Sequence, residues 1–147
     1  MSTSPLEAYI DGASQGNPGP AAMGVVFVDG EGRPVIRLSK YLGETTNNVA
    51  EYLALVYALQ EAQARGIKSL VVKTDSELMA KQLTGAYHVR DNTLRLFYDL
   101  AKSMTMRFEH FVIQHIDRTA NRQADRLAAE AIAARFDTSL KTVDSST

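Results

Sequence analysis

Apolar positions along the chain follow two periods, which separate strands from helices. Five segments are short apolar or alternating runs bounded by turn residues, and we predict strands at 6–10, 23–28, 34–42, 69–74 and 108–116. Four segments carry apolar residues at helical spacing, and we predict helices at 48–65, 76–83, about 94–104 and about 124–132. The predicted order is therefore βββαβααβα.

This order indicates the fold class. Short polar loops join the first three strands, one at 12–20 that is rich in Gly and Pro and one at 29–32, so these strands form an antiparallel meander. The apolar run at 70–72 is typical of a central parallel strand, and the helix at 48–65 is apolar nearly all the way round, which indicates burial on several sides. We predict an α/β fold with a mixed five-stranded sheet flanked by helices.

Composition narrows the class of protein. The chain has 147 residues, 45% of them hydrophobic, which fits one globular domain; we place it at 5–137, with a disordered polar tail at 138–147. A net charge of −1 excludes a histone-like polycation but not a nucleic-acid binder with clustered cations. Without cysteine there is no disulfide, zinc–thiolate site or thiol nucleophile. No apolar run reaches the ~18 residues of a membrane helix, and the N-terminus lacks the pattern of a signal peptide, so we expect a cytoplasmic protein without membrane contact.

Four acidic residues stand in short polar motifs at the edges of the apolar segments: Asp11, Glu51, Asp75 and Asp125. We expect Asp11 and Asp75 to follow directly after strands. If these strands are parallel neighbours, their carboxyl ends bring both carboxylates to one sheet edge. Clustered carboxylates raise one another's pKa and are stabilised by cations. Because oxygen ligands suit Mg²⁺, the motifs predict a divalent-metal site able to hydrolyse a phosphodiester.

Each motif also has a structural explanation. Asn48 and Glu51 fit a helix capping box, and Asp75 fits the cap of the helix that follows it. Asp125 fits a surface ion pair with Arg122, one turn back. Capping and metal binding are compatible, and the occurrence of all four motifs in one chain favours the metal site.

Together the motifs resemble those of type 1 ribonucleases H, which cut the RNA strand of an RNA/DNA hybrid. The matching stretches are Asp11-Gly12 with Gly16-Asn17-Pro18-Gly19, Thr46-Asn47-Asn48-x-x-Glu51, Thr74-Asp75-Ser76, and His115 ten residues before Asp125. The resemblance covers about residues 5–136 and implies the ribonuclease H-like fold. It also implies endonucleolytic hydrolysis with little sequence specificity, leaving 5′-phosphate and 3′-hydroxyl ends.

The resemblance assigns roles to the acids. Two Mg²⁺ ions would be bound with the substrate, and Mn²⁺ is expected to substitute. Asp11 would bridge both ions, with Glu51 and Asp75 completing the ion on the leaving-group side. Asp125 would help hold the ion that activates water, and His115 would assist proton transfer or product release. Alone, His115 also fits an ordinary loop histidine.

The resemblance further implies a surface for the hybrid. The substrate-binding candidates are Gly12, Ser14, Asn17, Thr46, Asn47, Asn48, Glu77, Lys81, Arg90 and Asn121. Thr46 and Asn48 would hold a phosphate of the DNA strand. Asn17 and Asn47 would contact the minor groove, where RNA displays its 2′-hydroxyls. We expect a monomer to bind the hybrid, because no apolar stripe is left exposed once the core is assigned.

Two features depart from the family pattern. Glu77 stands where the family often has Gln, whose amide donates to minor-groove acceptors as a carboxylate cannot. The stretch 76–92 is short and lacks the lysine-rich protrusion of several members, so the chain resembles the compact form. We expect weaker, less processive binding, with Lys81, Arg90 and Arg95 as the residual basic patch.

Two other functions stay open from the sequence alone. One is a different nuclease on the same fold, such as an exonuclease or a DNA-strand-transfer enzyme, which cleavage of single-stranded DNA would favour. The other is a binding module without activity, which metal-independent binding without cleavage would favour. The Asn-Asn-x-x-Glu and Gly-Asn-Pro-Gly motifs favour hybrid specificity over the other nucleases, and the presence of all four acids disfavours a binding module without activity.

Overall fold

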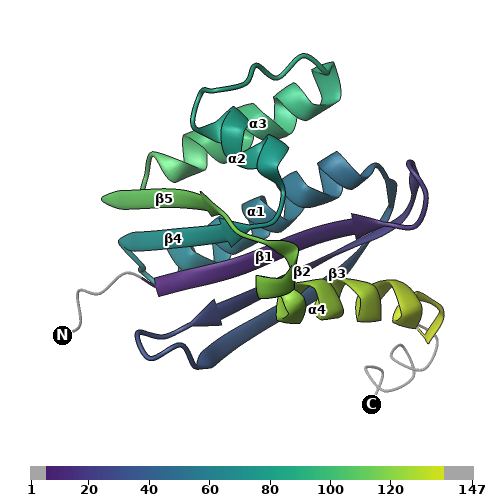
Figure 1. Ribbon diagram of the computed structural model, residues 1–147, viewed down its shortest axis with the longest axis horizontal. Coiled ribbons are helices and arrows are strands. Elements are labelled where there is room, and N and C mark those ends of the chain that lie inside the picture. Colours follow the sequence, from purple (N-terminus) through teal and green to yellow (C-terminus); the bar gives the residue numbers. More distant parts are fainter. Residues whose placement is uncertain (1–5, 138–147) are drawn as a thin grey trace.

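The computed structural model describes residues 6–137, so residues 1–5 and the predicted tail at 138–147 lie outside the described residues (Figure 1). The strands are β1 (Leu6–Ser14), β2 (Gly19–Val28), β3 (Pro34–Thr45), β4 (Ser69–Thr74) and β5 (His110–His115). The helices are α1 (Asn47–Ala64), α2 (Glu77–Leu83), α3 (Asn92–Thr105) and α4 (Arg122–Ala133), with the 3₁₀ turns η1 (Arg118–Ala120) and η2 (Ala134–Asp137). Apart from the 3₁₀ turns the predicted order is confirmed.

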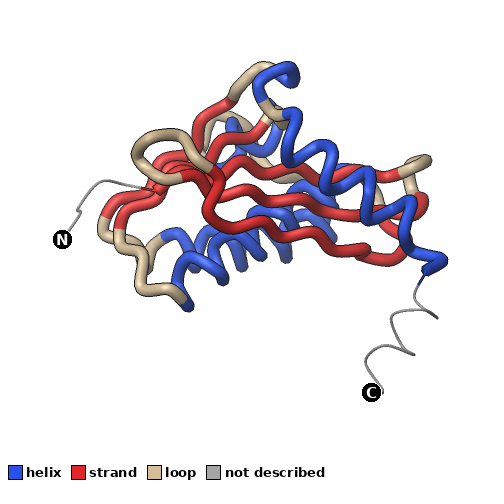
Figure 2. The backbone as a smooth tube through the Cα atoms, turned by 90° about the horizontal axis from the view of Figure 1, so that it is seen from below, coloured by secondary structure: helices blue, strands red, loops and turns tan. Residues whose placement is uncertain are grey.

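The strands form one mixed sheet in the order β3-β2-β1-β4-β5. The pairs β1–β2 and β2–β3 are antiparallel, whereas β4 runs parallel to β1 and β5 runs parallel to β4. Helices lie on both faces of the sheet, with α1 and α3 on one side and α4 on the other (Figures 1 and 2). The predicted mixed five-stranded α/β fold is therefore confirmed.

The main core lies between the sheet and α1. On β1, the side chains of Ala8 and Ile10 belong to this core and have no exposed surface. From α1, Ala54 and Ala58 are equally buried, and their small side chains let the helix lie close to the sheet. Because α3 packs against α1 as well, α1 is buried on several sides, as its apolar pattern predicts.

The opposite face is covered by α4, which crosses β2 at Gly24. A Cβ atom at Gly24 would lie 2.2 Å from the carbonyl oxygen of Ala124, closer than side-chain carbons approach backbone. Nearby, Ser39 of β3 donates a hydrogen bond of 2.8 Å to the carbonyl oxygen of Leu127. These contacts hold the first turn of α4, which carries Asp125, against the sheet.

The first strand is longer than predicted. β1 continues to Ser14 because the residues from Asp11 onward pair with β2. The predicted turn at 12–20 is therefore wrong at both ends, and only residues 15–18 turn. Asp11 consequently lies inside a strand, not directly after one as predicted.

The helix caps also differ from the structural explanations of the acids. Thr46 caps α1, and its Oγ1 accepts a hydrogen bond of 3.2 Å from a backbone nitrogen in the first turn. Asn48 lies inside that turn and is exposed, so the capping box with Glu51 is wrong. Likewise Ser76, not Asp75, caps α2. Both acids are therefore free of capping roles.

Part of α3 leaves apolar side chains in solvent. Leu96 is 71% exposed, and Leu100 is exposed beside it on the same helix. The premise of the monomer prediction, that no apolar stripe remains exposed, is therefore wrong. The oligomeric state, like the cellular location, stays a prediction. Within residues 6–137, no helix has the length and apolar character needed to cross a membrane.

Candidate active site

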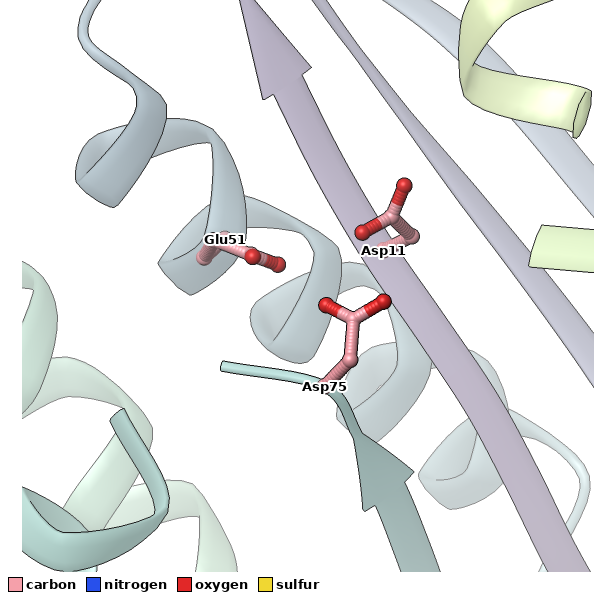
Figure 3. Close-up of side chains that lie close together, drawn as sticks. All are labelled: Asp11, Glu51 and Asp75. Carbon is pink, nitrogen blue, oxygen red and sulfur yellow. The ribbon is translucent and has the colours of Figure 1, made fainter. Parts of the chain in front are cut away.

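Three carboxylates from three different elements meet at one edge of the sheet (Figure 3). Asp11 comes from β1, Glu51 from α1 and Asp75 from the residue after β4, and one oxygen of each lies within 4.8 Å of the others. The parallel register brings the two aspartates together, because Ile10 pairs with Thr74 and the residues that follow them are neighbours. The prediction that the first and fourth strands are parallel neighbours is confirmed.

Glu51 reaches the site because α1 crosses β1 at Gly12. The backbone nitrogen of Gly12 donates a hydrogen bond of 2.9 Å to Glu51 Oε1. A Cβ atom at Gly12 would lie 2.2 Å from the carbonyl carbon of Ala50, so this approach requires glycine. Gly12 therefore orients Glu51; its contact with substrate stays a prediction.

Burial and mutual repulsion oppose the ionisation of two of these acids. Asp11 and Glu51 are each 5% exposed. Burial, with repulsion from Glu51 and Asp75, raises the pKa of Asp11 to about 9. Burial also raises the pKa of Glu51 to about 8, against the opposing effect of the Gly12 backbone N–H. A divalent cation bound between the acids would offset the cost of ionising Asp11 and Glu51. Because Mg²⁺ prefers carboxylate oxygens as ligands, these residues fit such an ion.

The fourth predicted acid, Asp125, lies beside this cluster and is more open to solvent. Its side chain is 41% exposed. Burial is the main cause of the raised pKa of Asp11, and the nearby Asp125 carboxylate raises that pKa further. Among the described residues its ion-pair partner is Arg118 of η1, with 3.9 Å between Nη2 and Oδ1, so the alternative explanation by a pair with Arg122 is wrong. All four acids line one cavity of about 340 Å³.

Arg118 is a further residue of the site that was not predicted from the sequence. Its side chain is exposed, lines the cavity, and counteracts part of the burial-driven rise in the pKa of Glu51. No motif marks this arginine. The one available signal was its place in the loop between two candidates, His115 and Asp125.

His115 ends β5, where it pairs in register with Thr74 and is exposed. It is not among the residues that line the acidic cavity. In the loop that follows, hydrogen bonds from Thr119, together with the nearby His115, hold the pKa of Asp117 below its usual range. A role of His115 in proton transfer or product release stays a prediction.

The predicted substrate-binding residues lie at different distances from the acids. Gly12, Asn47 and Glu77 line the acidic cavity. Asn17 Oδ1 accepts a hydrogen bond of 3.0 Å from the Asn47 backbone nitrogen, which ties the turn after β1 to the start of α1. Candidates that do not line the cavity but keep some exposed surface are Ser14, Thr46, Asn48, Lys81 and Arg90. Asn121 differs from all of these because its side chain is buried.

Comparisons with known proteins match most of the chain. A family model described as reverse transcriptase-like matches residues 9–131. Ribonuclease HI of Halobacterium salinarum is 44% identical over 127 residues, which are 86% of this chain and 64% of that protein. The structure of LC11-RNase H1 in complex with an RNA/DNA hybrid aligns with a TM-score of 0.85 at 40% identity, over 89% of this chain and 99% of that one. The chain spans only 34% of a bifunctional protein of Mycobacterium tuberculosis, which is 37% identical over 83% of this chain.

Proposed function

This chain belongs to the ribonuclease H family, and from that premise we propose that it hydrolyses the RNA strand of RNA/DNA hybrids by internal cuts. The observation that carries the proposal is the cluster of Asp11, Glu51 and Asp75, whose oxygens lie within 4.8 Å of one another. The hybrid bound by a relative of 40% identity supports this choice of substrate.

Divalent ions complete the proposed site. The acids that would hold two Mg²⁺ ions, or Mn²⁺ in their place, are Asp11, Glu51, Asp75 and Asp125. Bound there, the ions would lower the pKa of the attacking water and neutralise the departing 3′-oxygen, so that the products carry 5′-phosphate and 3′-hydroxyl ends. The raised pKa values of Asp11 and Glu51 support this proposal, because such carboxylates lose their protons when a cation binds beside them.

The chain's own residues would position the substrate. The Gly12 N–H holds the Glu51 carboxylate in the cluster. The Arg118 guanidinium, which lines the same cavity, suits a phosphate oxygen of the scissile strand. Asn47, anchored through Asn17, offers a small polar group beside the acids where a 2′-hydroxyl would be read without sequence preference.

Cleavage of an end-labelled RNA/DNA hybrid tests the proposal. With Mg²⁺, the wild-type protein is expected to cut the RNA internally. Asp11→Asn, purified in the same way, should lose activity by on the order of 10³-fold, because a neutral amide replaces a carboxylate that would hold the metal. The matched control is Glu130→Gln, which changes an exposed acid of α4 outside the proposed site and should leave activity unchanged.

Other outcomes would contradict the proposal in distinguishable ways. Equal activity of the wild type and Asp11→Asn would indicate a contaminating nuclease or a different centre. Cleavage of single-stranded DNA would favour another nuclease of the same fold. Binding without cleavage, in Mg²⁺ and in Mn²⁺, would favour a binding module.

A further inference from the structure

Asn121 occupies a buried position between the elements that carry the acids, and its side chain is 1% exposed. Its amide nitrogen Nδ2 donates to the carbonyl oxygen of Ile10 at 2.8 Å and to Asp75 Oδ2 at 3.3 Å. Its backbone oxygen accepts a hydrogen bond of 3.1 Å from the backbone nitrogen of Asp125. One residue between η1 and α4 therefore contacts β1, the end of β4 and the first turn of α4.

Each of these contacts bears on an acid of the site. Ile10 immediately precedes Asp11 and is the last residue of β1 in register with β4, so the bond to its carbonyl fixes the backbone that presents Asp11. The bond to Asp75 acts on the carboxylate itself, which Figure 3 shows directed toward Asp11 and Glu51. The backbone bond sets the turn that carries Asp125.

The amide of Asn121 has one orientation that satisfies these neighbours. The carbonyl of Ile10 and the carboxylate of Asp75 are both acceptors, so the donor Nδ2 must face them. Oδ1 is then buried and has no hydrogen-bond partner among the described residues. The observed donor contacts therefore aim the amide at the acidic site, one toward the backbone that precedes Asp11 and one toward the Asp75 carboxylate.

We infer that Asn121 is a positioning residue that orients the Asp75 carboxylate, and through Ile10 the backbone of Asp11, for metal binding. This inference rests on the proposed function. It replaces the predicted substrate contact of Asn121, because a side chain that is 1% exposed and has its donor group engaged presents nothing to a hybrid. Loss of such an outer partner typically weakens metal affinity or activity about 10- to 100-fold.

Two variants remove the contacts in different ways. Asn121→Ala deletes the amide, and Asn121→Asp keeps the shape but places an acceptor beside the Asp75 carboxylate. The matched control is Gln123→Glu, which adds the same charge at an exposed position of the first turn of α4. The measurements are the Kd of the free protein for Mn²⁺ by calorimetry, and kcat and KM on the hybrid well below the Tm of each variant.

For Asn121→Ala we expect the Kd for Mn²⁺ to rise about 10-fold and kcat to fall about 10- to 100-fold. The KM for the hybrid should change less than about two-fold, since no substrate contact is lost. Asn121→Asp should be impaired at least as strongly, because the oxygen that replaces Nδ2 is an acceptor and would face two other acceptors, the Ile10 carbonyl and the Asp75 carboxylate. Gln123→Glu should match the wild type in all three quantities.

The competing explanations predict other results. A raised KM with unchanged kcat and Mn²⁺ affinity would make Asn121 a substrate contact and overturn the inference. A lower Tm with normal Kd and kcat, or failure of both variants to fold, would assign it a structural role alone and overturn it too. If the wild type does not cut hybrids, the proposed function fails instead, and the Mn²⁺ affinities still decide the role of Asn121.

Discussion

Glu51 shows how a buried side chain is tuned by its immediate contacts. Its carboxylate has a backbone donor in Gly12 and faces Asp11 and Asp75. Burial outweighs that donor and raises the pKa of Glu51 to about 8, while burial and the neighbouring acids raise that of Asp11 to about 9. In the metal-free protein both groups therefore keep protons at neutral pH, which they release when cations bind.

These shifts predict how stability depends on pH at the level of single residues. In the unfolded chain both acids have a pKa of about 4. In the folded protein the pKa is about 8 for Glu51 and about 9 for Asp11, so between about pH 4 and these values the folded state binds more protons than the unfolded state. Their contribution to the free energy of unfolding is therefore highest below about pH 4 and falls as the pH rises toward 9. In EDTA, Glu51→Gln should raise Tm at about pH 9 by on the order of 5 °C, with no gain at about pH 5.

Circular dichroism across that pH range would measure this effect. Glu130→Gln is the matched control, because it neutralises an exposed acid of α4. A wild type whose Tm follows that of Glu51→Gln at every pH would show that Glu51 titrates normally in the folded protein.

At the scale of elements, two glycines determine how closely the helices approach the sheet. α1 crosses β1 at Gly12 and α4 crosses β2 at Gly24, and an added Cβ at either position would lie 2.2 Å from backbone atoms. Backbone cannot yield by changing a rotamer, so a larger residue must move the helix. These two approaches bring Glu51 and Asp125 to the strand that carries Asp11.

Gly12→Ala should therefore separate α1 from β1. We expect it to lower the free energy of unfolding by about 1–3 kcal/mol and to weaken Mn²⁺ binding, because Glu51 loses its place in the cluster. Urea denaturation and Mn²⁺ titration would measure both effects. Gly30→Ala, in the β2–β3 hairpin, is the control, since a Cβ there has nothing within 4 Å. Equal stability of the two variants would contradict the packing argument.

At the scale of the whole molecule, the net charge is −1, so attraction for the proposed hybrid substrate would have to come from local cations. The predicted basic patch of Lys81, Arg90 and Arg95 belongs to α2, α3 and the loop between them (Figure 1). Two of its cations form exposed ion pairs, Lys81 with Glu77 at 3.4 Å and Arg95 with Asp99 at 3.2 Å. Exposed pairs are weak, so these cations can exchange their partners for phosphates.

Reversing the three charges of the basic patch tests whether it binds the hybrid. The triple variant Lys81→Glu, Arg90→Glu and Arg95→Glu should raise KM for the hybrid by on the order of 10-fold at low salt and reduce its salt dependence, with kcat within about two-fold. Lys68→Glu, an exposed charge just before β4, is the control and should leave KM unchanged. An unaltered KM in the triple variant would remove the patch from the binding surface.

The sequence by itself determined the type and order of the helices and strands, the four acids and the family. These features are local: a period of two or of 3.6 residues belongs to one element, and a motif such as Thr74-Asp75-Ser76 is contiguous. Even the meeting of Asp11 and Asp75 followed from one topological rule, the parallel pairing of their strands.

Tertiary structure alone decided the features that depend on residues far apart in the chain. β1 extends past Asp11 because β2 pairs with it, and Glu51 is held by Gly12, 39 residues away. Arg118 enters the cavity only because η1 lies beside it, and Asn121 is buried against Ile10, 111 residues earlier. Burial, pKa and hydrogen-bond partners are set by packing between elements, and no local pattern encodes which distant atoms will fill the space around a side chain.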